Sequence, residues 1–274
     1  MQLTLRQLKL PFAISLVSLS FMPVQALPVK SKIFLPNWKL NSSSSQIFNA
    51  PPPPDDINAP GNRVGGGKRG CDGTYKQPAT SKGKLLTALV PVYQSPDAEL
   101  VLGLTTASHP TFWFYVPYLT TAATQFVLQN QAGQTIYQSP VLLSGTPGVV
   151  SLSLPPTVSP LEIDKQYHWY FNIYCHQQQP PVFVDGWIKR VELYPALKSQ
   201  LEKAPPKQRV ALYTSHGIWY EALTVSAELR RIDPKGADWT TMLQAVDLDR
   251  IASEPIVECC HLQGSSYNQL PNKT

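Results

Sequence analysis

The stretch YHWYFNIYC (Tyr167–Cys175) decides the fold class, because its side chains alternate between two kinds. Successive side chains of a β-strand point to opposite faces of a sheet, so every second residue shares a face. One face would carry the core-forming side chains of Tyr167, Trp169, Phe171, Ile173 and Cys175. The other would carry the polar and aromatic side chains of His168, Tyr170, Asn172, Tyr174 and His176. This pattern predicts a strand with one face on a core and the other at a sheet surface or domain interface.

Further strand patterns extend on both sides of this stretch. Leu152 and Leu154 alternate with serines, and residues 126–129 and 135–137 flank a turn sequence. Residues 182–191 supply another strand. Roughly six to eight short strands separated by proline and glycine are typical of an antiparallel sandwich. We therefore predict a β-rich α+β protein whose residues 85–193 form an immunoglobulin-like β-sandwich.

The pattern changes to helices after Tyr194. Leu193, Leu197 and Leu201 recur at helical spacing, and residues 210–232 form the strongest helical segment. Asp238 is a suitable cap for a third helix. We predict a small three-helix subdomain over residues 194–262 that ends with a cysteine pair, and a disordered tail over 263–274.

Residues 1–26 have the features of a signal peptide. Arg6 and Lys9 precede an apolar run over 10–21, and small residues lead to Ala26, after which we expect cleavage. The run is shorter than the roughly 20 residues that span a bilayer. We therefore expect an exported protein of the periplasm or cell envelope with no membrane span after cleavage.

Residues 27–84 differ in composition from the rest of the chain. They contain a serine run at Ser42–Ser45, a proline run at Pro51–Pro54 and a glycine run at Gly65–Gly67. Prolines remove backbone donors and glycines add chain entropy, so such a stretch is poorly suited to a sheet or a core. The composition predicts a disordered arm.

Four runs resemble one known family. They are HPTFWFYVPY (His109–Tyr118), GWIKRV (Gly186–Val191), ALYTSHGIWYEAL (Ala211–Leu223) and ECC (Glu258–Cys260). Together they resemble an exported cyanobacterial family catalogued as domain of unknown function 928, over roughly residues 65–260. The resemblance implies export and the same two-part layout. It implies no activity and no catalytic residue.

The four cysteines favour disulfides, because an even number in an exported chain usually pairs. One connectivity pairs the adjacent Cys259 and Cys260, and we disfavour it because the ring would strain the intervening peptide bond. The other two connectivities join Cys71 and Cys175 to that pair and remain open alternatives. Cys259, Cys260 and His261 lack the spacing of a zinc site, so we expect no metal and no cofactor.

A dense aromatic run, Phe112–Tyr115 followed by Tyr118, has two interpretations. In the favoured one, Phe112, Phe114 and Val116 fill the sandwich while Trp113 and Tyr115 pack beneath the helices. In the other, Trp113 and Tyr115 form an exposed platform for sugar rings or peptides. The candidate partner-binding residues, including two from the helical segment, are Trp113, Tyr115, Tyr118, Trp219 and Tyr220.

No catalytic motif emerges from the sequence, so we assign no catalytic residue. The loop Gly65–Cys71 lacks the spacing of a phosphate-binding loop, and Ser215 and His216 are adjacent on a predicted helix and point apart. The net charge of +5, two of which belong to the signal peptide, forms no concentrated basic face, so we expect no nucleic acid partner.

Three functions fit these observations. The favoured one is a non-catalytic interaction module that binds an envelope protein or polysaccharide. The alternative is a secreted hydrolase acting on envelope sugars or peptides, which would be favoured if Asp185, His168 and Glu192 met in a deep cleft. A third is a scaffold that spaces other components through its long arm.

Overall fold

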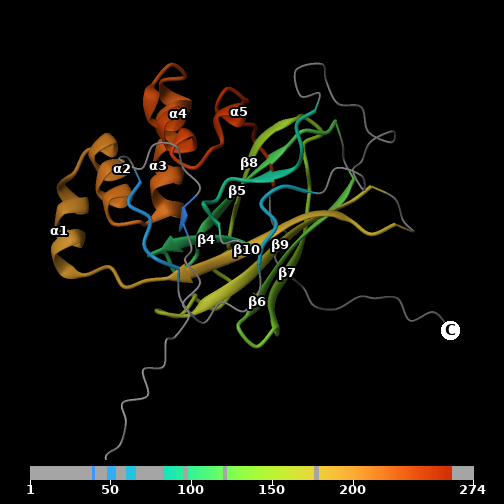
Figure 1. Ribbon diagram of the computed structural model, residues 1–274, viewed down its shortest axis with the longest axis horizontal. Coiled ribbons are helices and arrows are strands. Elements are labelled where there is room, and N and C mark those ends of the chain that lie inside the picture. Colours follow the sequence, from blue (N-terminus) through green and yellow to red (C-terminus); the bar gives the residue numbers. More distant parts are fainter. Residues whose placement is uncertain are drawn as a thin grey trace, which may run out of the picture. The chain divides into compact units, whose positions relative to one another are not determined.

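The computed structural model describes most of the chain beyond residue 82 and several short segments before it (Figure 1). The described residues are 39–40, 48–53, 60–65, 83–94, 98–119, 122–175 and 179–260. The predicted signal peptide, the predicted tail over 263–274, Cys71 and His261 lie outside these residues.

Within the described residues, ten strands form two sheets, which confirms a β-rich α+β protein (Figure 1). The strands are β1 (Lys39–Leu40), β2 (Thr87–Ala88), β3 (Val92–Gln94), β4 (Glu99–Thr105), β5 (Thr111–Val116), β6 (Ala123–Asn130), β7 (Thr135–Val141), β8 (Gly148–Ser153), β9 (Gln166–Tyr174) and β10 (Val182–Arg190). The larger sheet has the order β1-β3-β4-β10-β9-β6-β7, and the smaller has the order β2-β5-β8. All pairs are antiparallel except β4 and β10, which are parallel, so the larger sheet is mixed.

Strand β9, which contains most of the stretch Tyr167–Cys175, alternates as its sequence predicts. Trp169, Phe171 and Ile173 are fully buried, whereas Tyr174 on the other face is exposed. The hairpin between β6 and β7 is also confirmed, and Gly133 at its tip has a φ of 75° that suits glycine.

Segments of the predicted arm lie in the fold, so the prediction of disorder is wrong for them. Phe48 is buried, and its ring makes an edge contact with Trp219 at 5.0 Å between centroids. Residues 60–65 lie between the two sheets: Asn62 pairs with Asp185 of β10, and Val64 pairs with Thr87 of β2. The prediction from composition is wrong here because strands distant in sequence provide the hydrogen-bond partners of these backbone groups.

In the part of the chain described up to residue 260, five helices follow the strands, where the sequence predicted three (Figure 1). They are α1 (Pro195–Lys203), α2 (Pro206–Ser215), α3 (Trp219–Ile232), α4 (Ala237–Gln244) and the short α5 (Asp249–Ala252). The segment predicted as one helix over 210–232 is divided at Gly217, whose φ of 70° is left-handed and ends α2. Among the described residues, no helix has the length and apolar character that crossing a membrane requires.

Strand β5 is buried on both faces, as the favoured interpretation of its aromatic run predicts. Phe114 stacks on Phe171 of β9 at 4.3 Å between ring centroids, in the core between the sheets. On the opposite face Trp113 makes an edge contact with Trp239 of α4 at 6.0 Å. The smaller sheet therefore has one face on the larger sheet and the other on α4, while α3 also contacts β4 of the larger sheet directly, where Ile218 pairs with Leu104.

A buried carboxylate fixes helix α3 to the strands. Glu221 Oε1 accepts hydrogen bonds from Thr105 Oγ1 at 2.6 Å, Thr106 N at 3.0 Å and Ala107 N at 2.8 Å. Burial raises the pKa of Glu221, although these hydrogen bonds oppose the rise. The helices and strands are thus joined by a polar network as well as by the core.

The disulfide pairing differs from both of the favoured connectivities. Cys259 and Cys260 are bonded to each other, so neither is joined to Cys71 or Cys175. Cys175 is itself disulfide-bonded. The expectation is wrong because the chain at Cys260 adopts a left-handed φ of 75°, a backbone conformation in which the small ring closes.

Candidate functional site

Three rows of side chains cross the face of the larger sheet that points away from the smaller one. The register of β6, β9 and β10 defines them. The rows are Gln125–Asn172–Phe183, Val127–Tyr170–Asp185 and Gln129–His168–Trp187. We call these nine residues, together with Tyr174 at the end of β9, the outer face. Their position follows from strand alternation, because their neighbours in sequence fill the core.

A chain of hydrogen bonds runs through the middle of the outer face. Tyr170 Oη lies 2.9 Å from His168 Nδ1, and His168 Nε2 lies 2.8 Å from Asp185 Oδ2. The other oxygen, Asp185 Oδ1, accepts hydrogen bonds from the backbone N and Nδ2 of Asn62, at 3.1 and 2.7 Å. Both ring nitrogens of His168 and both oxygens of Asp185 are therefore engaged.

The imidazole is further fixed by stacking. The His168 ring lies parallel to Trp187, with an interplanar angle of 11° and 4.4 Å between centroids. Trp187 packs in turn with Tyr93, Leu100 and Leu102 in a second small core on this side of the sheet. The histidine is held by its neighbours on three sides, which leaves it little freedom to move.

The phenol at the end of this chain stays protonated near neutral pH. Burial raises the pKa of Tyr170, and the nearby charge of Asp185 raises it further. A protonated hydroxyl can donate to His168 Nδ1, which leaves Nε2–H to donate to Asp185. Tyr170 is thereby unsuited to act as a nucleophile, because the deprotonated form is disfavoured.

Beside this chain the outer face presents exposed aromatic rings. Tyr174 and Phe183 are 38% and 39% exposed. The carboxamides of Gln125 and Asn172 lie in the same part of the face, and the Tyr174 hydroxyl donates to Gln125 Oε1 at 3.4 Å. The one charged side chain of the three rows, Asp185, is buried, so the exposed part of these rows is uncharged; Lys189, the next residue on this face of β10, lies beyond them.

The partner-binding residues predicted from sequence lie elsewhere and are buried. Trp113, Tyr115, Tyr118, Trp219 and Tyr220 are each 2% exposed or less. The Trp219 indole N–H donates to Leu89 O at 2.8 Å, and that of Trp113 donates to Thr224 Oγ1 at 3.0 Å. The hypothesis of an exposed platform at Trp113 and Tyr115 is therefore wrong, and all five residues form the core and the helix–sheet contact.

Of the three residues that would favour a hydrolase, the structure brings two together. His168 and Asp185 are in contact, but Glu192 is exposed beyond the end of β10. Neither His168 nor Asp185 lines any of the three pockets described next.

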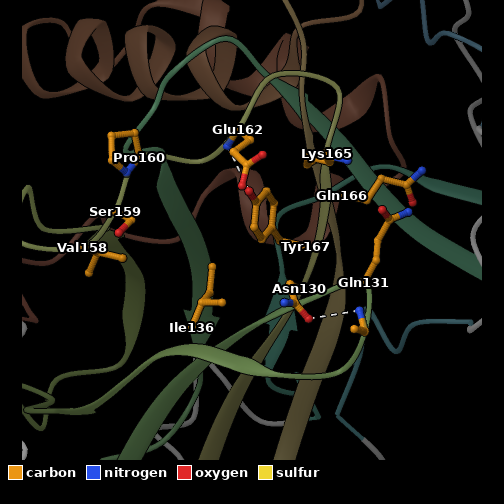
Figure 2. A pocket seen from close by; sticks show the side chains of 11 residues that line it. Asn130, Gln131, Ile136, Val158, Ser159, Pro160, Glu162, Lys165, Gln166 and Tyr167 are labelled. Carbon is orange, nitrogen blue, oxygen red and sulfur yellow. Dashed lines mark hydrogen bonds between the residues drawn. The ribbon is translucent and has the colours of Figure 1, made fainter.

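Three open pockets lie in the described part of the chain. Figure 2 shows one of about 550 Å³ between the β6–β7 hairpin and the loop before β9, lined by Glu162, Lys165 and Tyr167 among others. In it the Tyr167 hydroxyl accepts a hydrogen bond from Glu162 N at 2.9 Å, while Glu162 and Lys165 are both exposed. The second, of about 630 Å³, lies between α2 and α4, and the third, of about 420 Å³, lies beside α5.

No described group of three or more histidine, cysteine, aspartate or glutamate side chains is placed to hold a metal ion.

The fold and the outer face define a β-rich α+β protein with an aromatic, uncharged sheet surface. A family model with the description Domain of Unknown Function (DUF928) matches residues 64–256. The chain therefore belongs to this family. No curated protein and no solved structure matches it.

The sequence contained a signal for the outer face. Alternation placed His168, Tyr170 and Tyr174 together on the non-core face of one strand. It gave no means of finding Phe183 and Gln125 beside them, because strand register is set by pairing between distant segments.

Proposed function

We propose that the protein is an exported, non-catalytic interaction module of the cyanobacterial periplasm or cell envelope, and that its outer face holds a neutral polysaccharide. The observation that carries the proposal is the exposure of Tyr174 and Phe183 beside the carboxamides of Gln125 and Asn172. Aromatic faces pack against the C–H-rich faces of sugar rings, and carboxamides both donate to and accept from hydroxyl groups.

The lack of exposed charge in the three rows favours this ligand over an acidic or basic partner. Asp185 is buried among its hydrogen-bond partners, and the other row members are neutral or aromatic side chains. A charged partner would lose its hydration on such a surface without gaining a counter-charge. A neutral glycan meets no such penalty.

Two features support export. The first is the signal-like sequence of residues 1–26. The second is that Cys175, Cys259 and Cys260 are disulfide-bonded, and such bonds persist in oxidising compartments. An immunoglobulin-like arrangement of the strands is part of the same proposal. Two sheets that share one core support this arrangement, whereas the parallel pair of β4 and β10 departs from the antiparallel pairing of an immunoglobulin-like sandwich.

The contact between His168 and Asp185 is the one observation that favours the alternative, a secreted hydrolase of envelope sugars or peptides. Both nitrogens of His168 are hydrogen-bonded within the protein, and Tyr170 stays protonated. These hydrogen bonds therefore fix the side chains in place and leave no free group for proton transfer to a substrate. Release of soluble sugars or peptides by the wild type, abolished in His168→Ala, would favour the hydrolase.

Co-sedimentation with insoluble glycans tests the proposal. The purified protein is mixed with cellulose, curdlan, chitin or isolated peptidoglycan, and the bound fraction is measured at low and high salt. We expect binding to at least one neutral glycan that salt does not weaken. The double variant Tyr174→Ala/Phe183→Ala should bind at least tenfold more weakly.

A matched control separates the outer face from general surface hydrophobicity. Ile232 is 83% exposed at the end of α3, so Ile232→Ala removes an exposed apolar side chain elsewhere. It should bind as the wild type does. Equal binding by the double variant and the wild type, or no binding to any neutral glycan, would show that the outer face has another role.

A further inference from the structure

The disulfide between Cys259 and Cys260 lies directly after a segment that is fixed to the smaller sheet. Val149 N donates to Pro255 O at 2.8 Å, and Val257 N donates to Val149 O at 2.9 Å, so this segment runs along β8. The two cysteines follow it, half-buried against the core. One side of the disulfide thus rests on a fixed scaffold, and its partial exposure leaves it open to attack from solvent.

The bond closes a small ring that contains the intervening peptide bond. The two Cα atoms are 3.7 Å apart, whereas disulfides usually join Cα atoms about 4.4–6.8 Å apart. A ring between neighbours also closes no loop of chain, so it adds almost nothing to the constraint that makes other disulfides stabilising. Cys260 has a left-handed φ of 75°, which side chains other than glycine rarely adopt. The ring is therefore costly to hold closed, and little stability is lost when it opens.

The fold offers a partner to the reduced form. Cys259 Sγ lies 3.5 Å from the backbone oxygen of Leu142. A disulfide sulfur carries no hydrogen, so this contact is no hydrogen bond while the ring is closed. A thiol does carry one and can donate it, although weakly, to a carbonyl. Opening of the ring therefore gives the sulfur an acceptor that is already in place.

We propose that Cys259–Cys260 is a thiol–disulfide exchange site that takes a dithiol as its reductant. A thiolate of the dithiol attacks one of the two sulfurs, the bond between Cys259 and Cys260 breaks, and the leaving sulfur takes up a proton. The second thiol of the reductant, as its thiolate, then attacks the mixed disulfide. The reductant leaves as a disulfide, and the protein gains two electrons and two protons as two thiols. This site does not depend on the outer face or its ligand.

Peptide mapping in a redox series tests the proposal, with Cys175 as an internal reference. The full protein is equilibrated with increasing ratios of reduced to oxidised dithiothreitol, and then acid-quenched, denatured, labelled with N-ethylmaleimide and cut with trypsin. By sequence, Cys259 and Cys260 share the peptide Ile251–Lys273, whereas Cys175 lies in Gln166–Lys189. We expect two labels on Ile251–Lys273 at a ratio at least tenfold lower than the ratio that labels Cys175.

A variant with one glycine inserted between Cys259 and Cys260 tests the cause. The insertion enlarges the ring and relaxes its backbone, so the variant should need at least tenfold more reductant than the wild type. The unfolding temperature of the insertion variant, measured in parallel, shows whether this variant is folded. The double variant Cys259→Ser/Cys260→Ser should unfold within a few degrees of the wild type, since the ring adds little stability.

Three results of the redox series would overturn the proposal. They are labelling of Cys259 and Cys260 at the same ratio as Cys175 or a higher one, labelling of both without any reductant, and a disulfide-linked pair of the two tryptic peptides. An unchanged ratio in the insertion variant would do the same, because the closed ring would then not be the reason for reduction.

Discussion

Replacement of Glu221 gives the sharpest test of how the helices are fixed to the strands. Glu221→Ala removes the acceptor of Thr105 Oγ1, Thr106 N and Ala107 N at once. A buried donor left without a partner costs about 1–3 kcal/mol. Thr105 Oγ1 and Thr106 N lose their acceptor, whereas Ala107 N keeps Thr105 Oγ1, so we expect a loss of about 3–5 kcal/mol in total. For a chain of this size that corresponds to a fall in the unfolding temperature of about 6–20 °C.

Glu221→Gln is the matched control, because its amide oxygen can keep the same three donors. We expect it to cost less than about 1.5 kcal/mol. Urea unfolding followed by far-ultraviolet circular dichroism gives both free energies of unfolding. If the two variants lie within about 0.5 kcal/mol of each other, the hydrogen bonds to Oε1 do not fix the helices and the reasoning fails.

The same pair predicts a pH dependence. The pKa of Glu221 is raised in the folded protein from the ordinary value of 4.5, so the folded state binds this proton more tightly than the unfolded state does. The stability that the protonated form contributes is complete below the unfolded pKa and is lost as the pH rises through the folded pKa. The wild type should therefore lose stability relative to Glu221→Gln as the pH rises from 4.5, and parallel curves for the two proteins would contradict this.

Three further substitutions test the packing. Gly217→Ala should lower the free energy of unfolding by about 1–2 kcal/mol for its left-handed φ, and by more because its Cβ would lie 2.5 Å from Pro51. Gly133→Ala has a similar φ and open space around its Cβ, so it should lose only the roughly 1–2 kcal/mol that the φ costs. Thermal unfolding of both variants measures the difference, and equal losses would refute the contact between residue 217 and Pro51. Trp113→Ala should cost about 3–5 kcal/mol in urea unfolding, and a loss below about 1 kcal/mol would show that this ring is not packed beneath the helices. Tyr170→Phe removes the hydroxyl bonded to His168 and should lower the free energy of unfolding by about 0.5–1.5 kcal/mol in urea unfolding. An unchanged free energy of unfolding would show that this hydrogen bond does not stabilise the fold.

Local periodicity predicted what depends on single segments. The alternation in β9, the hairpin between β6 and β7 and the two-sided burial of β5 all follow from side chains a few residues apart. The change from strands to helices after Tyr194 follows from the same source. These features could be predicted because each is set by its own residues.

Features that depend on distant partners were missed. Nothing in the sequence of residues 60–65 indicates a strand, and the segment is extended because Asp185, Leu86 and Ala88 supply its backbone hydrogen-bond partners. Trp113 and Tyr115 are chemically suited to an exposed platform, and only the packing of α4 on Trp113 decides against it. Tyr220 is on α3 and is covered by Phe112 of β5. The division of α2 from α3 depends on Gly217, a residue that an uninterrupted helix tolerates at a cost of about 1 kcal/mol.

The bridge that residues 60–65 make between the sheets has a consequence for how the chain matures. Its partner in β10 is synthesised more than a hundred residues later, since Asn62 and Asp185 are 123 positions apart. Pairings of such long range slow folding, because a large loop must close before the contact forms. Residues 60–65 therefore cannot pair with β10 until nearly the whole strand region has left the ribosome. A polypeptide that crosses a membrane in an extended state would form this pairing only after it has crossed.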